Sequence, residues 1–244
     1  MNILVNTEIS IPYYVQIYVE LKDKIESMVY KPNEMLPSEN ELVEQFKVTR
    51  VTVRNAIKKL KDEGRIHTEK GIGSFVNPPR IMQQLHKMYS LTREFVEEGH
   101  DLEIVIINMH TDHYTNVIKK NLQLEPEDEV VLIQIIRKIH DIPVLAQFSY
   151  LPLKVIPDLS LAELKDASIY TILKEKYNIK LLNAKEYLDP IIADDYYSKL
   201  LEVELNTPLF LTERITYTSD DRPIEFRKCV VRSDKFRFFV DCIS

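Results

Sequence analysis

Residues 36–64 carry the signals for two helices separated by a very short break, and this arrangement limits the possible folds more than any other feature. Ser38 and Glu41 form a capping-box pattern, in which each side chain satisfies the other residue's free backbone N–H. Thr49 can cap a second helix only a few residues after the first, and Gly64 provides a stop for it. The sequence therefore predicts two helices that meet through a tight turn.

The second of these helices has two chemically different faces. Val53, Ile57 and Leu60 recur at four- and three-residue spacing, which predicts a buried apolar stripe. Cationic side chains occupy another face of this helix: Arg50, Arg54, Lys58 and Lys61. Residues 47–70 hold eight Lys and Arg against three Asp and Glu, although the whole chain has a formal charge of −6. A local basic patch of this kind suits contact with phosphates, whereas by itself it would be better explained as a solvated helix face.

A glycine-rich hairpin is expected directly after these helices. Three of the four glycines in the chain lie between residues 64 and 73, and short strand-like runs at 65–69 and 74–76 flank Lys70 and Gly71. A hairpin with a cation and a glycine at its tip can approach phosphates or a minor groove closely. Residues 1–77 therefore read as a winged helix-turn-helix, whose second helix would enter the major groove of double-stranded DNA.

Four sequence runs in this region resemble the DNA-binding domain of the GntR family of transcriptional regulators. They are LPSENELVEQF (36–46), VTRVTVR (48–54), LKDEG (60–64) and KGIGSFV (70–76). The resemblance implies DNA contacts from the recognition helix and the wing, and with Asn40 and Lys58 added the predicted set is Asn40, Thr49, Arg50, Thr52, Arg54, Lys58, Lys70 and Gly71. Within it, the two arginines are expected to specify sequence, and the lysines to anchor the DNA backbone.

The chain departs from the family pattern at two positions of this domain. Relatives commonly carry arginine where Asn40 stands, which changes the expected operator preference. They also commonly carry glycine at the turn between the helices, where this chain has Lys47. If the backbone there has a positive φ, the lysine bears a strain on the order of 1 kcal/mol.

A linker at 78–89, which begins with two prolines, is expected to join this domain to a mixed α+β domain at 90–244. The hydrophobic patterning predicts helices at 90–98, 113–121, 168–177 and 193–201. It predicts strands at 102–110, 129–139, 143–151, 180–189, 209–218, 223–232 and 236–242.

The second domain resembles the effector-binding UTRA domain of the HutC branch of the same family, which has a chorismate-lyase-like fold. The motifs that carry the resemblance are SLT (90–92), residues 137–143, SIY (168–170), PLFLTER (208–214) and RPIE (222–225). The resemblance implies a cradle for an anionic effector, often a phosphosugar. Its expected residues are Ser90, Leu91, Thr92, Arg137, Ser168, Tyr170 and Glu225.

Three positions leave the class of effector open between a phosphosugar, another acidic metabolite and a ligand of a different kind. Many relatives have a second arginine where Ile135 stands, a glutamate where Gln147 stands, and, in some sugar-phosphate binders, a tyrosine where Val231 stands. Arg214 and Glu225 could form a buried pair between neighbouring strands, with a structural role or a ligand role.

The chain is therefore predicted to be a homodimeric, sequence-specific transcriptional regulator that represses from a palindromic operator and is released by a small-molecule effector. Activation or co-repression by the ligand, a residual lyase-like activity, and a domain that only dimerises are the alternatives. No enzyme, cofactor or metal site is expected, since the sequence has no nucleophile elbow or phosphate loop and His110 and His113 lack a third clustered ligand.

A cytoplasmic location without membrane contact is expected from the first residues, the lack of a long apolar run, and the cysteines. The first residues have neither a basic segment nor an extended apolar run, and no apolar run is long enough to cross a bilayer. Cys229 and Cys242 are most simply reduced core residues.

Overall fold

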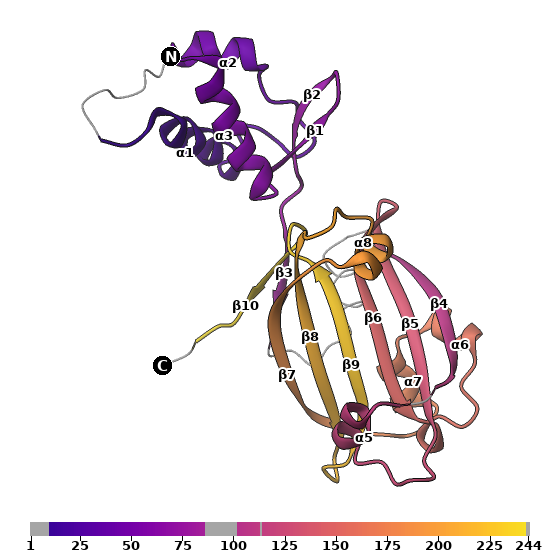
Figure 1. The fold of residues 1–244 in the computed structure, drawn as a ribbon. Helices are drawn as coiled ribbons and strands as arrows, with labels where there is room; N and C mark the ends of the chain where they lie inside the picture. Colours follow the sequence, from indigo (N-terminus) through magenta and orange to yellow (C-terminus); the bar gives the residue numbers. More distant parts are fainter. Residues whose placement is uncertain (1–9, 86–101, 113, 243–244) are drawn as a thin grey trace. The chain divides into compact units, whose positions relative to one another are not determined.

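The computed structural model describes residues 10–85, 102–112 and 114–242, which form two compact units, Met1–Ile81 and Met82–Ser244 (Figure 1). Each unit is described by itself below. No helix in the described part of the chain is long and apolar enough to span a membrane.

The first unit is the predicted winged helix-turn-helix. Its elements are α1 (Tyr13–Glu26), α2 (Glu39–Phe46), α3 (Arg50–Asp62), β1 (Ile66–Glu69) and β2 (Gly73–Val76). The capping box of Ser38 and Glu41 forms as expected, and the Thr49 hydroxyl accepts a hydrogen bond from the backbone N–H of Thr52. Lys47 ends α2 with φ 55° and ψ 45°, the left-handed conformation that glycine adopts most easily.

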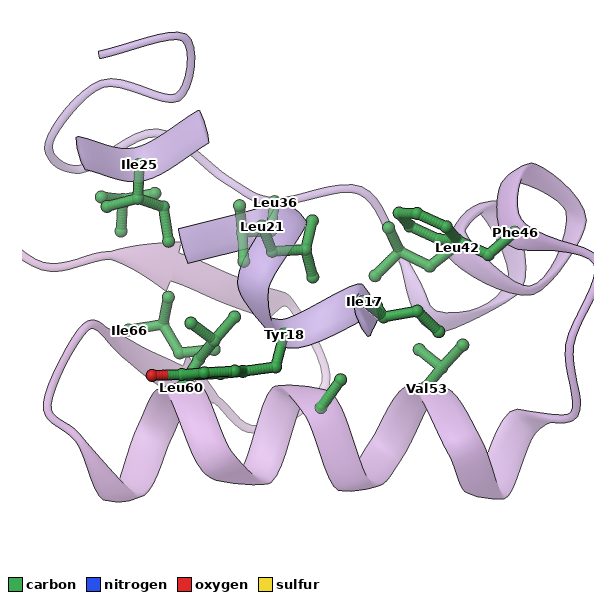
Figure 2. Close-up of a cluster of buried hydrophobic side chains, with 12 residues drawn as sticks. Ile17, Tyr18, Leu21, Ile25, Leu36, Leu42, Phe46, Val53, Leu60 and Ile66 are labelled. Atoms are coloured by element: carbon green, nitrogen blue, oxygen red, sulfur yellow. The ribbon is translucent and has the colours of Figure 1, made fainter. Parts of the chain in front are cut away.

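One hydrophobic cluster holds these helices together. Ile17, Leu21 and Ile25 recur along one side of α1 and pack against the predicted stripe of α3, where Val53 and Leu60 are fully buried (Figure 2). Each such side chain contributes about 1.5–3 kcal/mol by leaving water. Because this apolar stripe faces the core, the cationic face of α3 is left for solvent.

The segment between α1 and α2 ties the hairpin to this core. The backbone N–H of Asn33 donates to the carbonyl of Val76 at 2.8 Å, and that of Leu36 donates to the carbonyl of Ser74 at 2.8 Å. In return the N–H of Val76 donates to the carbonyl of Glu34 at 2.9 Å. The base of the β1–β2 hairpin is therefore fixed next to the helices, and its tip projects from it.

The second unit is built on an antiparallel sheet with the strand order β4-β5-β6-β9-β8-β7. Its strands are β4 (Leu102–Asp112), β5 (Val130–Ile139), β6 (Ile142–Pro152), β7 (Leu181–Ile192), β8 (Pro208–Thr218) and β9 (Pro223–Arg232). The predicted β5–β6 hairpin turns through His140 and Asp141, which both have positive φ, as a tight two-residue hairpin requires. The expected mixed domain of helices and strands is confirmed.

Helices cover both faces of this sheet. α5 (Asn116–Leu122) and α8 (Asp195–Leu201) pack on one face (Figure 1). Phe226 of β9 is buried beneath α5, and Val230 of β9 is buried beneath α8. α6 (Leu161–Asp166), which the sequence patterning did not predict, and α7 (Ile169–Glu175) pack on the opposite face. Strand residues two positions apart share a face, so Glu225, Arg227 and Cys229 all lie on the α6–α7 side.

Two parts of the chain differ from the sequence-based expectation. Residues 81–84, inside the predicted linker, form strand β3 (Ile81–Gln84), which pairs with β10 (Phe236–Phe239) as a separate ribbon. Ile81 and Gln83 are buried while Met82 is exposed, an alternation that suits a strand with one covered side. Cys229 is buried, but Cys242 is exposed, because it follows the end of β10, so its assignment to the core was wrong. The predicted helix at 90–98 lies outside the described residues.

Candidate DNA-binding surface and effector cavity

The residues predicted to contact DNA lie on the surface of the first unit. Thr49, Arg50 and Arg54 occupy the cap and the first turns of α3, and all are exposed, as are Asn40 on α2 and Lys58 further along α3. Thr52 is half-buried, and its hydroxyl lies 2.9 Å from that of Thr49. Thr49 and Thr52 therefore also help to cap the N-terminus of α3.

The two arginines of α3 are held by side chains from the start of α2. The Nη2 of Arg50 donates to the Oδ1 of Asn40. The Nε of Arg54 donates to both carboxylate oxygens of Glu39, at 3.1 Å and 2.9 Å, and the Nε of Arg50 lies 3.9 Å from the same carboxylate. The side chains of Arg50 and Arg54 are still 55% and 61% exposed. Their guanidinium groups are thus oriented without being buried.

The tip of the hairpin presents the other predicted contacts. Lys70 is exposed, and Gly71 follows it with φ 81°, a conformation that residues with a Cβ rarely adopt. No heavy atom lies within 4 Å of the position that a Cβ would take there, so the backbone conformation rather than space demands the glycine. The structure therefore exposes both a cation and a bare backbone at the wing.

Three of the predicted effector residues line a small cavity between the sheet and α7. Arg137 of β5 lines it together with Ser168 and Tyr170 from the start of α7, and its volume is about 30 Å³. Gln147 and Ser149 of β6 line it from the sheet. Ser90, Leu91 and Thr92 lie outside the described residues.

A chain of hydrogen bonds joins Arg137 to Glu225 through β6. The Nη1 of Arg137 donates to the Oε1 of Gln147 at 2.7 Å, the Nε2 of Gln147 donates to the Oγ of Ser149 at 2.9 Å, and that hydroxyl donates to Glu225 Oε1 at 2.8 Å. The hydroxyl of Tyr170 donates to the other oxygen of Glu225 at 2.7 Å. The structure therefore links Arg137, Tyr170 and Glu225, three of the predicted residues, in one buried network.

Burial shifts the pKa values of Arg137 and Tyr170 so that the neutral form of each is favoured. It lowers the pKa of Arg137 to about 10, so the guanidinium is still charged at neutral pH. Burial, together with the negative charge of Glu225, raises the pKa of Tyr170 to about 12. Tyr170 therefore remains a neutral hydrogen-bond donor to the carboxylate.

Arg214 does not pair with Glu225, so that expected pair is wrong. The strand register places Arg214 opposite Glu186 of β7, and its Nη2 lies 2.6 Å from the Oε2 of Glu186. The same register places Thr216 opposite Glu225, and the Thr216 hydroxyl donates to the carboxylate at 3.2 Å. Arg214 and Glu225 are thus two positions apart in the register of β8 against β9, and each meets a different partner.

A larger cavity, of about 370 Å³, lies at one end of the same sheet and contains none of the predicted residues. Two of its cations, Lys154 and Arg222, already pair with Asp128 and Asp220, and Lys180 also lines it. Among the residues that the structure describes, no hydrogen-bonded network of buried side chains borders it as the Arg137 network borders the smaller cavity. We therefore place the candidate effector site at the smaller cavity, which Arg137, Ser168 and Tyr170 line.

Comparison with known proteins identifies both domains of the chain. Residues 13–76 match the model of bacterial regulatory proteins of the gntR family, and residues 97–237 match the UTRA domain. The chain belongs to the GntR family. It is a DNA-binding transcriptional regulator with a UTRA domain, the class of domain that binds small molecules in this family.

The similarity to individual proteins extends over nearly the whole chain. The transcriptional repressor NagR of Bacillus subtilis is 30% identical, and the match covers 100% of both chains. The probable fructoselysine utilization operon repressor of Escherichia coli is 25% identical over 93% of each chain. The solved structure of PhnF from Mycobacterium smegmatis is 26% identical, with a TM-score of 0.65 over 93% of this chain and 99% of that one. The names of NagR and of the fructoselysine operon repressor agree with the prediction that the chain is a regulator and not an enzyme.

Three residues that lie on or beside the candidate DNA-binding surface, Val51, Ile72 and Glu39, were not among those predicted from the sequence. Val51 is 67% exposed beside Arg50, and Ile72 is exposed at the tip of the wing. Val51 stands outside the apolar stripe of α3, which was a usable signal, since an apolar side chain away from the core faces solvent. Glu39 carried no such signal, because its contact with Arg54 depends on how α2 and α3 pack.

Proposed function

We propose that this GntR-family regulator is a homodimeric repressor that binds a palindromic operator and is released when an anionic metabolite binds its UTRA domain. The observation that carries the DNA-binding half is the exposed pair Arg50 and Arg54, oriented at the first turns of α3. The observation that carries the sensing half is the buried network from Arg137 to Glu225 beside a cavity. Repression is the activity in the names of NagR and of the fructoselysine operon regulator.

The recognition helix would lie in the major groove, with its N-terminal residues at the base edges. A guanidinium reads guanine through two hydrogen bonds, so Arg50 and Arg54 are assigned to specificity. Asn40 and the threonine pair lie beside them and would add contacts to bases or phosphates. Lys58 and Lys70 are more distant, exposed cations and are assigned to the phosphate backbone, where binding depends on salt rather than on sequence.

Two copies of α3 give the specificity that one copy lacks. One recognition helix covers only a few base pairs, whereas an inverted repeat presents two half-sites whose grooves lie about 34 Å apart. We assign the dimer contact to the second unit, where β7 is an edge strand with exposed Leu182, Tyr187 and Ile192. A long edge strand with apolar side chains is a surface that proteins usually cover. A DNA-binding regulator of this kind would act in the cytoplasm.

The test is a pair of titrations on the full chain. A thermal-shift screen of phosphosugars, amino acids and carboxylates first identifies the ligand, which at 100 times its Kd should stabilise the protein by about 2.7 kcal/mol. Operator affinity is then measured with and without that ligand, and it should fall about tenfold when ligand is present. The operator must weaken ligand binding by the same factor, a coupling of about 1.4 kcal/mol.

Two outcomes would overturn parts of this proposal. Tighter operator binding in the presence of ligand would mean instead that the protein is a ligand-activated activator or that the ligand is its co-repressor. A normal response of the Arg137→Ala variant would remove Arg137 from the effector site. Light scattering of the protein alone and on operator DNA gives the stoichiometry, and a monomer in both samples would exclude the dimer.

A further inference from the structure

Arg227 of β9 lines the cavity that we assign to the effector, on the same wall as Ser149. It follows Glu225 by two residues, so both side chains lie on the face that α6 and α7 cover. The register places it opposite Ser149 of β6 on one side and Arg214 of β8 on the other. Its side chain is only 5% exposed, so a full positive charge is buried at the edge of this cavity.

The charges around Arg227 are unevenly matched. Arg227 and Arg214 both turn to one carboxylate, that of Glu186, at 3.4 Å and 2.6 Å. Glu225 is another carboxylate on this face, and its oxygens already accept hydrogen bonds from three hydroxyl groups, those of Ser149, Tyr170 and Thr216. Two guanidinium groups therefore share a single carboxylate as a hydrogen-bonded partner.

The hydrogen-bonding capacity of Arg227 is also incompletely used. Within the part of the chain that the structure describes, its Nε is buried and has no hydrogen-bond partner. Buried donors to charged groups are normally satisfied, since leaving one unmade is costly. Burial alone would lower the pKa of Arg227, but electrostatic interactions with neighbouring groups, Tyr170 and Cys229 first and then Glu225 and Glu186, outweigh it and raise that pKa. Arg227 therefore stays charged and keeps a donor to offer.

We propose that Arg227 is a specificity-determining residue of the effector site, which provides a second guanidinium beside Arg137 and selects a ligand with a dianionic group such as a phosphate monoester. The proposal rests on the effector site that we assign under the proposed function. Ile135, on the strand that carries Arg137, supplies no charge to this cavity, whereas Arg227 supplies it from β9 across the sheet. Charge-assisted hydrogen bonds from two arginines suit an oxyanion with several acceptor oxygens.

The test compares inorganic phosphate with acetate at equal ionic strength and at pH 8, with the full chain followed by thermal shift and calorimetry. The wild-type protein should bind phosphate in preference to acetate. Arg227→Gln should weaken phosphate binding about tenfold or more, which is the usual effect of losing a charged hydrogen bond, and should leave acetate binding nearly unchanged. A wild-type protein with no preference for phosphate would overturn the proposal.

Two further variants separate a binding role from a role in folding. Arg214→Gln removes an equally buried guanidinium that bonds to the same Glu186 but does not line this cavity, so it should retain phosphate binding. Glu186→Gln removes the carboxylate that competes for Arg227, and it should tighten phosphate binding, a gain that misfolding cannot produce. Equal losses in Arg214→Gln and Arg227→Gln, or no gain in Glu186→Gln, would contradict the assignment.

The proposed function and this inference fail in different ways. If Arg137→Gln abolishes phosphate binding while Arg227→Gln leaves it intact, the effector site stands and the role of Arg227 is wrong. If neither variant alters binding, phosphate binds elsewhere and the assignment of the cavity itself is wrong.

Discussion

Glu39 at the start of α2 holds Arg54 of α3 through both of its carboxylate oxygens, at 3.1 Å and 2.9 Å from the arginine Nε. The two side chains are 37% and 61% exposed, and an exposed pair of this kind contributes about 0–1 kcal/mol to folding. Its larger effect is on DNA. The carboxylate orients an arginine that we assign to base recognition, and it also places a negative charge where phosphates would approach.

Replacing Glu39 with glutamine should therefore change DNA binding more than folding. We expect Glu39→Gln to bind random duplex DNA more tightly and to lose part of its preference for the operator, because Arg50 and Arg54 are freed for non-specific phosphate contacts. Fluorescence anisotropy at several salt concentrations measures both affinities. Glu44→Gln removes an exposed charge from the same helix and is the control. An equal effect in both variants would show that only net charge matters.

Arg54 and Lys58 are one turn apart on α3 and should behave differently. Arg54→Ala should cost about 1–3 kcal/mol on the operator and relax the preference at one base pair. Lys58→Ala should weaken all duplex DNA nearly equally and reduce the salt slope by about one. Titrations on operator and random DNA distinguish these effects, and equal losses on both DNAs for Arg54→Ala would contradict its assignment to base recognition.

Lys47 bears backbone strain that a single substitution can remove. Its φ of 55° is in the left-handed region, where a Cβ is unfavourable and glycine is not. Lys47→Gly should stabilise the first unit by about 1 kcal/mol, measured by hydrogen exchange of the α3 core amides in the full chain. Lys47→Ala keeps the Cβ and is the matched control, so a similar gain in that variant would assign the effect to loss of the lysine charge.

Glu163 of α6 makes the helix layer over the effector cavity sensitive to acid. Its hydrogen bonds with Lys176, at 2.7 Å, and with Ser160 lower the pKa of its carboxyl to about 2. A carboxyl with a lowered folded pKa stabilises the fold fully above its unfolded pKa of about 4.5, and the effect is lost as pH falls toward 2. At pH 7 the wild-type protein should therefore have a higher melting temperature than Glu163→Gln. The difference in melting temperature should shrink below about pH 4.5.

Glu175→Gln, an exposed change on α7, is the control for that experiment. A gap between the wild-type protein and Glu163→Gln that persists unchanged at pH 3 would contradict the shifted pKa of Glu163.

The parts of the fold that the sequence predicted well depend on local chemistry. Ser38 and Thr49 cap helices through backbone groups within three residues, and the stripe of Val53 and Leu60 follows from helical periodicity. The wing follows from Gly71 and its neighbours. The backbone strain at Lys47 was expected because lysine stands there at a tight turn where relatives commonly have glycine.

The parts that the sequence did not predict depend on how distant segments pair. The partner of Arg214 is set by the register of β7 against β8, and one position in either strand would change it. The strand at 81–84 forms because β10, about 150 residues later in the chain, lies beside it. Arg227 could have been placed beside Glu225 by strand alternation, but its nearness to Arg137 requires the order of β5, β6 and β9.

The most direct test of the central claim is selection of DNA by the full-length protein from a pool of random duplexes, at about 0.15 M salt, where non-specific contacts are weakened. The wild-type protein should enrich an inverted repeat whose half-sites are about one helical turn, or a multiple of it, apart. A variant with both Arg50→Ala and Arg54→Ala should still bind DNA at low salt but should enrich no such repeat. Enrichment of no motif by the wild-type protein, or of the same motif by the double variant, would contradict the account of α3 as the element that reads the operator.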